Sequence, residues 1–138
     1  MRGGVCAGVQ FEENVMSTKK TVVVGASPNP GRYAWIATEM LKEYDHPIVP
    51  LGIRSGEIAG EPIVDIRTKP EIPDVDTVTL YLSPAHQQQW YDYLIDLKPK
   101  RIIFNPGTEN DEFKQRAREA GIEAVEACTM VLLRSKQY

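Results

Sequence analysis

A glycine, a serine and an arginine follow the first β-branched run of the chain, and together they are typical of a turn that binds phosphate. Gly25 comes directly after the run Thr21–Val24, Ser27 lies two residues further on, and Arg32 precedes a helical pattern. Glycine allows a sharp turn, and the N–H groups at the start of a helix have no partners within that helix. Such donors and the positive end of the helix dipole favour a phosphate, and hydroxyl and guanidinium groups also suit an anion.

The same segment departs from the fingerprint of dinucleotide-binding domains. That fingerprint has the form G-x-G-x-x-G, whereas the next glycine after Gly25 is Gly31. The second predicted strand ends in residues 49–52 without the carboxylate that binds the ribose of NAD. Arg54 could instead bind the 2′-phosphate of NADP, so an NADP-dependent oxidoreductase stays an alternative. Another alternative is an interaction module without a ligand, in which Gly25 serves the turn geometry alone.

The sequence predicts no catalytic centre. His46 precedes a proline in a predicted turn, and His86 lies in the first turn of a predicted helix. A general base also needs a partner within hydrogen-bonding reach, and no spacing in the sequence supplies one. The three glutamines at 87–89 are interpreted as a solvated helix face. Whether the protein is an enzyme is left open, with a binding function favoured.

These residues must be positioned by strands that alternate with helices. Extended runs are predicted at 21–24, 48–51, 77–82, 101–104 and 122–126, with a further short extended piece at 63–66. Pairing of the second run is expected to stop at Pro50. Helices are predicted at 33–44, 84–98 and 110–120, whereas residues 52–62 read as a loop. This order predicts an α/β fold with a single doubly wound parallel sheet of about five strands and helices on both faces. Ligands in such sheets bind at the carboxyl ends of the strands, where residues 25–28, 82–84 and 105–110 should share one rim.

The length and composition favour one globular domain. The chain has 138 residues, of which 42% are hydrophobic and 25% charged, and its net charge of −3 argues against nucleic-acid binding. No apolar run is long enough to cross a membrane. The two cysteines form no C-x-x-C pair, which fits a reducing, cytoplasmic setting. Residues 1–15 are interpreted as a disordered upstream extension and residues 16–138 as the domain. Tyr91 and Tyr93, expected to be exposed, suggest a possible homodimer.

Several segments, taken together and in order, resemble a known family. They are residues 23–28, 32–33, 49–50, 105–110 and 126–129. Their order and spacing resemble the stand-alone CoA-binding proteins, which are small Rossmann-like domains similar to the amino-terminal domain of the succinyl-CoA synthetase alpha subunit. The resemblance extends over about residues 21–134 and implies a Rossmann-like domain with coenzyme A or an acyl-CoA as its ligand. The phosphorylated histidine of the synthetase belongs to a second domain outside the resemblance, so ligase activity is not implied.

The resemblance also implies which residues contact the ligand. The first turn would line the pyrophosphate, and Arg54 would lie near the 3′-phosphate or the adenosine. Residues 82–84 would flank the nucleotide, and residues 105–107 would lie near the pantetheine arm. No metal ligand is expected. The predicted site residues are Gly25, Ala26, Ser27, Pro28, Arg32, Arg54, Leu82, Ser83, Pro84, Asn105, Pro106 and Gly107.

Cys128 follows the last predicted strand. We interpret it as a small buried hydrophobic residue. The alternative is a thiol near the pantetheine sulfur, able to form a mixed disulfide if its pKa is low.

Overall fold

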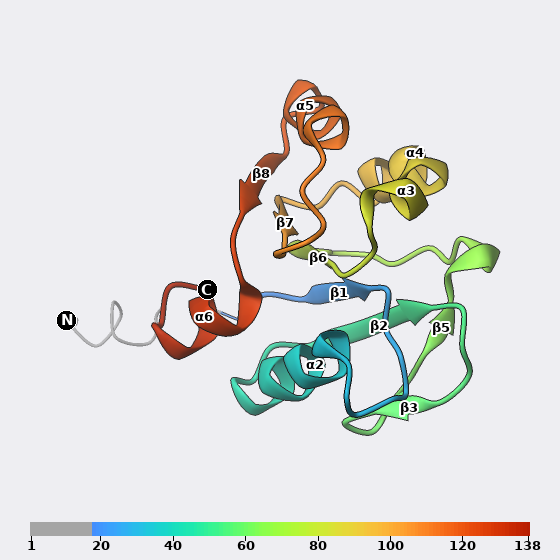
Figure 1. The fold of residues 1–138 in the computed structure, drawn as a ribbon, viewed down its shortest axis with the longest axis vertical. Helices are drawn as coiled ribbons and strands as arrows, with labels where there is room; N and C mark the ends of the chain where they lie inside the picture. Colours follow the sequence, from blue (N-terminus) through green and yellow to red (C-terminus); the bar gives the residue numbers. More distant parts are fainter. Residues whose placement is uncertain (1–17) are drawn as a thin grey trace, which may run out of the picture.

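Six parallel strands form the central sheet of this protein. The computed structural model describes residues 18–138, so the predicted extension at 1–15 lies outside the described part. The strand order is β5-β2-β1-β6-β7-β8 (Figure 1). The bounds are β1 Thr21–Val24, β2 Ile48–Gly52, β5 Val64–Asp65, β6 Thr77–Leu80, β7 Arg101–Phe104 and β8 Glu123–Glu126. The predicted parallel α/β sheet is confirmed, with one strand more than the five expected.

The additional strand pairs with the end of β2. Leu51 lies opposite Val64 in the register of β2 and β5. The expectation that pairing stops at Pro50 is wrong, because Pro50 lies opposite Val23 of β1 and the strand continues to Gly52. The carbonyl oxygen of Leu51 points toward β1. Successive residues of a strand direct their main-chain groups to opposite sides, so the N–H that Pro50 lacks would point away from β1, at a level where β5 has not yet begun.

The segment expected to be a loop contains a small hairpin. Strands β3 (Glu57–Ile58) and β4 (Glu61–Pro62) pair antiparallel. Ala59 and Gly60 join them, both with positive φ, at 53° and 84°. Two consecutive residues of this kind form the tight turn that matches the twist of a hairpin. The sequence did not reveal the hairpin because two-residue strands are too short to show an alternating pattern.

Helices cover both faces of the sheet, as predicted (Figure 1). On one face lie α2 (Tyr33–Glu43) and α6 (Thr129–Arg134), and the other face carries the remaining helices. Successive strand residues point to opposite faces. In β1, therefore, Val22 and Val24 pack with α4 and α5, whereas Val23 packs with α2 and α6. The remaining helical bounds are α3 Pro84–Gln87, η2 Gln88–Trp90, α4 Tyr91–Asp96 and α5 Asp111–Glu119.

The single helix predicted over 84–98 is broken by the 3₁₀ turn η2. Trp90 and Tyr91, at the break, are both buried in the core. The Tyr93 hydroxyl donates a hydrogen bond to the carbonyl oxygen of Pro70 and is also partly buried. The two tyrosines that suggested a homodimer are therefore packed against the chain itself. Among residues 18–138, the exposed large hydrophobic residues are Tyr33, Tyr44, Ile53 and Val131.

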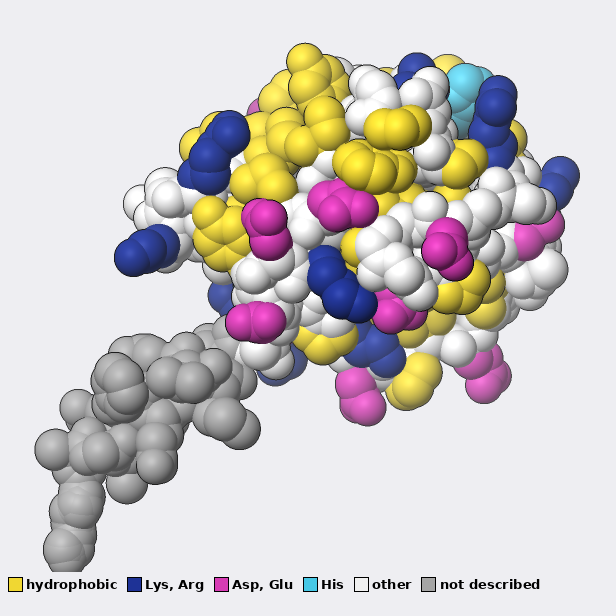
Figure 2. All heavy atoms as spheres, turned by 90° about the horizontal axis from the view of Figure 1, so that it is seen from below, with side chains coloured by type: hydrophobic (Ala, Val, Ile, Leu, Met, Phe, Trp, Pro, Cys, Tyr) yellow, Lys and Arg dark blue, Asp and Glu magenta, His cyan; other side chains and the backbone are white. Residues whose placement is uncertain are grey.

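The face of α2 and α6 carries hydrophobic side chains among charges of both signs. Figure 2, seen from the side of these helices, shows hydrophobic groups gathered over part of the surface, with acidic and basic groups interspersed. Residues 18–138 contain no helix that is long and apolar enough to cross a membrane.

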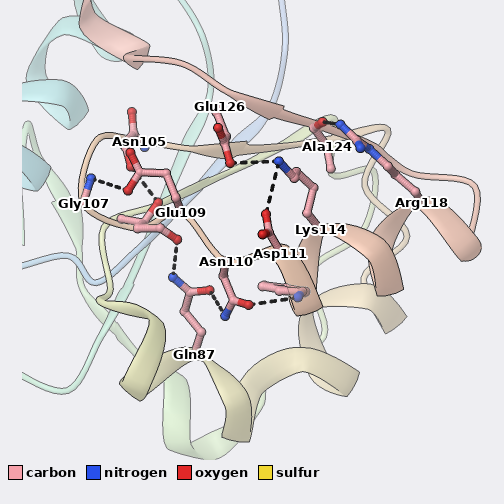
Figure 3. Close-up of polar contacts among 12 residues, drawn as sticks. Gln87, Asn105, Gly107, Glu109, Asn110, Asp111, Lys114, Arg118, Ala124 and Glu126 are labelled. Carbon is pink, nitrogen blue, oxygen red and sulfur yellow. Dashed lines mark hydrogen bonds and ion pairs between the residues drawn. The ribbon is translucent and has the colours of Figure 1, made fainter.

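The edge strand β8 is covered by side chains from α5 (Figure 3). The N–H groups of Glu123 and Ala127 bond to the carbonyl oxygens that precede and end β7, so the main-chain groups of Ala124 point away from the sheet. The Arg118 guanidinium donates a hydrogen bond of 2.8 Å to that outward carbonyl of Ala124. Lys114 donates to the Glu126 carboxylate at the same distance of 2.8 Å.

Tyr138 lies at the amino edge of the sheet, beside the start of β1. Its hydroxyl shares a hydrogen bond of 2.6 Å with the Thr21 hydroxyl, and its carbonyl oxygen accepts hydrogen bonds from Lys19 and Arg101. The His46 ring lies 4.8 Å from the tyrosine ring, between centroids. The Nδ1 atom of His46 accepts a hydrogen bond of 2.9 Å from the N–H of Lys19. These contacts hold the C-terminal Tyr138 and the segment before β1 against the start of the sheet.

Candidate functional site at the carboxyl edge of the sheet

The turn after β1 uses its first two main-chain donors within the protein. The N–H groups of Gly25 and Ala26 both donate to the carbonyl oxygen of Leu51, each at 2.9 Å. Gly25 has a φ of +96°, a conformation that glycine adopts without strain. The turn is therefore fastened to the end of β2, and these two N–H groups are not free for a ligand.

Free main-chain donors lie further along, where α2 begins. Within residues 18–138, the N–H groups of Ser27, Tyr33 and Ala34 have no hydrogen-bond partner. Arg32 occupies the N-cap position without a capping hydrogen bond from its side chain, and the first turn of α2 contains no acidic residue. The exposed Arg32 side chain forms no ion pair within the described residues. The helix start thus presents unpaired N–H groups, the positive end of a dipole and one cation.

Two glycines bring the loop after β2 against this turn. A Cβ atom at Gly52 would lie 2.3 Å from the carbonyl oxygen of Ala26, and one at Gly56 would lie 2.7 Å from the Cβ of Pro28. Arg54 lies between these two glycines and is exposed. The loop that carries Arg54 therefore packs on the turn, as the predicted site requires.

The loop after β6 packs on the other side of the turn. A Cβ atom at Gly25 would lie 2.9 Å from the carbonyl oxygen of Tyr81 and 3.2 Å from a methyl group of Leu82. Ser83 and Pro84 follow and are exposed. The predicted residues after β1, β2 and β6 thus lie in contiguous segments of one rim.

Asn105 has an internal role. Its side chain is 1% exposed, its Nδ2 donates to the Thr79 hydroxyl and the Leu80 carbonyl, and its Oδ1 accepts from the Thr129 N–H. These bonds use both amide hydrogens and the oxygen. The side chain joins β6, β7 and α6, so any contact of Asn105 with a ligand must come from its main chain. Pro106 is exposed beside it.

Gln87 is buried, contrary to the interpretation of residues 87–89 as a solvated face. Its Nε2 donates to the carbonyl oxygens of Leu82, at 2.9 Å, and Thr108, at 2.8 Å. Its Oε1 accepts from Asn110 Nδ2 at 2.9 Å (Figure 3). Its neighbours Gln88 and Gln89 are exposed, as expected. A run of three glutamines carries no periodic signal that marks one of them as internal.

Gly107 lies at the exposed tip of the loop after β7. Its N–H donates a hydrogen bond of 2.9 Å to a carboxylate oxygen of Glu109 (Figure 3). Its φ of +92° is in the region that glycine favours. At the end of the loop, Asn110 caps α5 by accepting a hydrogen bond from the Phe113 N–H.

An acid and a base beside the end of β2 were not predicted from the sequence. Asp65 lies opposite Gly52 in the register of β5 and β2. Its carboxylate accepts hydrogen bonds from Arg67 Nε at 2.9 Å and Nη2 at 3.0 Å. The hydrogen bonds from Arg67 lower the pKa of Asp65, so the carboxylate stays charged and paired. Only the unexpected pairing of β5 with β2 brings this pair to the rim.

The groups that could do acid–base chemistry at the rim are few. The Ser83 hydroxyl lies 3.1 Å from His86 Nδ1, and both side chains are exposed. Within the described residues no carboxylate is hydrogen-bonded to His86, as a nucleophile–histidine pair would need for orientation. Burial raises the pKa of Tyr81, which keeps its hydroxyl protonated. Cys128 is a free, partly buried thiol. Residues 18–138 contain no group of three or more potential metal ligands.

Comparisons with known families and structures agree with this architecture. The family model described as a CoA binding domain matches residues 19–134. The crystal structure of an uncharacterised protein is 46% identical, with 88% of this chain and 98% of that chain covered and a TM-score of 0.85. The curated proteins that were compared contain no match to this chain.

Two further solved structures share the fold. The PH1109 protein redesigned for binding is 25% identical, with 94% of this chain and 90% of that chain covered and a TM-score of 0.77. A Thermus thermophilus protein, cell-free ID.343, is 21% identical, with 94% and 98% covered and a TM-score of 0.78. The second likeness concerns the fold alone.

Proposed function

Because the chain belongs to the CoA binding domain family, we propose that it binds coenzyme A or an acyl-CoA at the carboxyl edge of its sheet. The observation that carries this proposal is the start of α2, where the N–H groups of Tyr33 and Ala34 and the cation of Arg32 have no partner within residues 18–138. A pyrophosphate has the charge and the acceptor oxygens that such a helix start favours. The N–H of Ser27 supplies one more donor from the turn.

The 3′-phosphate of CoA is assigned to the loop that carries Arg54. That loop packs on the turn through Gly52 and Gly56, so a ligand held at the turn has an exposed guanidinium beside it. Arg67, although paired with Asp65, lies at the same end of the sheet and adds a second basic group. Guanidinium groups bind phosphate oxygens through paired hydrogen bonds.

We assign the pantetheine arm to the loop after β7 and also to the loop after β6, which the resemblance places beside the nucleotide. Leu82, Ser83 and Pro84 adjoin the turn, and Pro106 and Gly107 are exposed on the next strand of the sheet. Neighbouring strands are about 4.8 Å apart, so a flexible arm anchored at β1 reaches the end of β7. The proposed activity is binding, since the rim offers no oriented nucleophile or base.

Thermal unfolding of the full chain with CoA, dephospho-CoA, NADH and NADPH tests the proposal. A ligand that binds only the native state raises the melting temperature in proportion to its affinity and concentration. We expect a shift with CoA, a smaller shift with dephospho-CoA, and none with NADH or NADPH. A shift with NADPH and none with CoA would contradict the proposal and favour an oxidoreductase. Equal melting temperatures with all four ligands would favour an interaction module.

A further inference from the structure

Gln87 connects the two loops to which the pantetheine arm is assigned. Its amide donates one hydrogen to the Leu82 carbonyl and the other to the Thr108 carbonyl, and its oxygen accepts from Asn110. The side chain is 0% exposed, so water does not compete for these bonds. Every polar group of the amide is therefore used to connect segments that are not neighbours in sequence.

At its start, the loop from 105 to 110 is held to the end of β6 by the bonds of Asn105 to Thr79 and Leu80. The N–H and the hydroxyl of Thr108 both donate hydrogen bonds to the carbonyl oxygen of Asn105, which stabilises the loop internally. Asn110 Nδ2 donates a hydrogen bond of 2.8 Å to the Tyr91 hydroxyl. The side chain of Gln87 bonds to this loop at Thr108 and to the loop before α3 at Leu82, and so connects the two directly. Figure 3 shows its contacts with the loop 105–110.

The same connection continues to the turn that begins the site. A Cβ atom at Gly25 would lie 2.9 Å from the Tyr81 carbonyl oxygen and 3.2 Å from a methyl group of Leu82, so the loop after β6 packs closely on the turn. A shift of the loop after β6 would therefore displace the turn and, through Gln87, the loop after β7. The three segments form one unit, in which Gln87 is the buried link.

We propose that Gln87 is a positioning residue for the bound ligand: it holds the loops 82–84 and 105–110 in the arrangement that receives the pantetheine arm, without touching the ligand. This inference rests on the proposed function. A site whose loops are ordered before binding spends less of its interaction energy on ordering them. Without the link, only the fraction of molecules with both loops in place binds the arm, and the apparent dissociation constant rises in inverse proportion to that fraction.

Titration calorimetry with two ligands tests the inference. Gln87→Met keeps the approximate volume of the side chain and removes both donors. Gln89→Met makes the same change at an exposed position of the same segment and is the matched control. We measure CoA and adenosine 3′,5′-bisphosphate, which lacks the pantetheine arm. We expect Gln87→Met to bind CoA about tenfold more weakly, as for a tenfold smaller competent fraction, and to bind the bisphosphate as the wild type does.

A purely structural role of Gln87 predicts a different result. In that case Gln87→Met lowers the melting temperature but leaves the CoA affinity of the folded protein unchanged, which overturns the inference. Equal weakening of both ligands also overturns it, because the effect then lies at the phosphates. Failure of the wild type to bind CoA overturns the proposed function as well, so the two failures are distinguishable.

A second variant keeps the test decisive if Gln87→Met does not fold. Gln87→Glu keeps the shape and an acceptor for Asn110, and it removes the donors to the two carbonyl oxygens. We expect it to bind CoA as weakly as Gln87→Met, with faster amide hydrogen exchange at Gly107 and unchanged exchange at the start of α2. Wild-type CoA affinity in Gln87→Glu would overturn the inference, since donation would then be unnecessary.

Discussion

The carbonyl oxygen of Ala26 lies 2.3 Å from the point where a Cβ atom at Gly52 would stand. The φ of Gly52 is outside the positive region, so only this contact demands glycine there. Gly52→Ala must displace the turn after β1, and we expect it to lower the free energy of unfolding by about 1–3 kcal/mol, the usual cost of overpacking. We also expect weaker CoA binding, because the displaced turn begins the site. Urea unfolding and calorimetry measure the two effects.

Gly121→Ala provides the comparison for this prediction. Gly121 follows α5 with a φ of +82°, and a Cβ atom there would meet nothing within 4 Å. Its substitution costs backbone strain without touching the site, so stability should fall while CoA affinity stays unchanged. If Gly52→Ala behaves in the same way, the close contact with Ala26 has no bearing on binding.

Arg32→Ala is expected to weaken CoA binding about tenfold or more, the effect of losing one charge-assisted hydrogen bond to a phosphate. The salt dependence of the affinity should also fall, because one cation no longer faces the ligand. Lys42→Ala is the matched control, since it removes an exposed cation from the last turn of the same helix. Equal affinities of the two variants would contradict the assignment of the helix start.

Ser27→Ala is expected to have a smaller effect than Arg32→Ala. The Ser27 hydroxyl accepts a hydrogen bond from the Asn29 N–H at 3.2 Å and lies in the turn itself. Its loss removes one neutral group and leaves the N–H of Ser27 in place. We expect a CoA affinity about two- to fivefold lower, in line with a neutral hydrogen bond. A loss as large as that of Arg32→Ala would point instead to a collapsed turn, which the melting temperature would reveal.

Arg54→Ala is expected to weaken CoA binding and to leave dephospho-CoA binding unchanged. The two ligands differ only in the 3′-phosphate, so dephospho-CoA is the control within the same variant. The dissociation constant of dephospho-CoA divided by that of CoA should fall from about ten in the wild type toward one in Arg54→Ala, as for a lost charge-assisted contact. A ratio that stays at its wild-type value in Arg54→Ala would move the 3′-phosphate to another residue, with Arg67 the next to test.

The stability of the domain is expected to fall as the pH drops below about 6.5. Burial, Lys19 and Arg101 lower the pKa of His46 from its ordinary value of 6.5, so the unfolded state binds a proton more readily than the folded state. The stabilisation is complete above pH 6.5 and is lost as the pH falls through the lower folded pKa. Protonation also removes the Nδ1 acceptor of the Lys19 N–H, while Asp76 and Asp45 oppose the shift only in part.

Urea unfolding between pH 5 and 8 measures this effect, and the second histidine is its control. The chain contains two histidines, and His86 is exposed. His46→Gln should flatten the pH dependence of the unfolding free energy in this range, whereas His86→Gln should keep it. A wild-type slope in His46→Gln would show that another group carries the pH dependence.

The sequence allowed the elements with regular patterns to be predicted. The buried β1 run, the helix after Arg32, and the α5 boundaries at Asn110 and Gly121 depend on local patterns and capping residues, and these are confirmed. The sixth strand, β5, lies within the short extended piece predicted at 63–66, but its pairing with β2 did not follow from the sequence. The hairpin β3–β4 has two residues in each strand, which is too short for a period. Both form because the chain between β2 and β6 must pack on neighbours that are distant in sequence.

The candidate site shows the same division between local and distant causes. The positions of the turn and of the exposed loop residues followed from strand ends that share one edge. The internal roles of Gln87 and Asn105 did not follow, because each is defined by carbonyl groups on other strands and loops. Nor did the use of the Gly25 and Ala26 N–H groups by Leu51, which moves the free donors to the start of α2.

The contact between Arg118 and the outward carbonyl of Ala124 bears on how the molecule behaves when it is concentrated. An open edge strand offers unpaired groups on which a strand from another molecule can add, and sheets that grow in this way aggregate. Here α5 places a guanidinium on one of those groups and an ion pair of Lys114 and Glu126 beside it. An incoming strand would have to displace both cations, so this end of the sheet resists extension into intermolecular sheets.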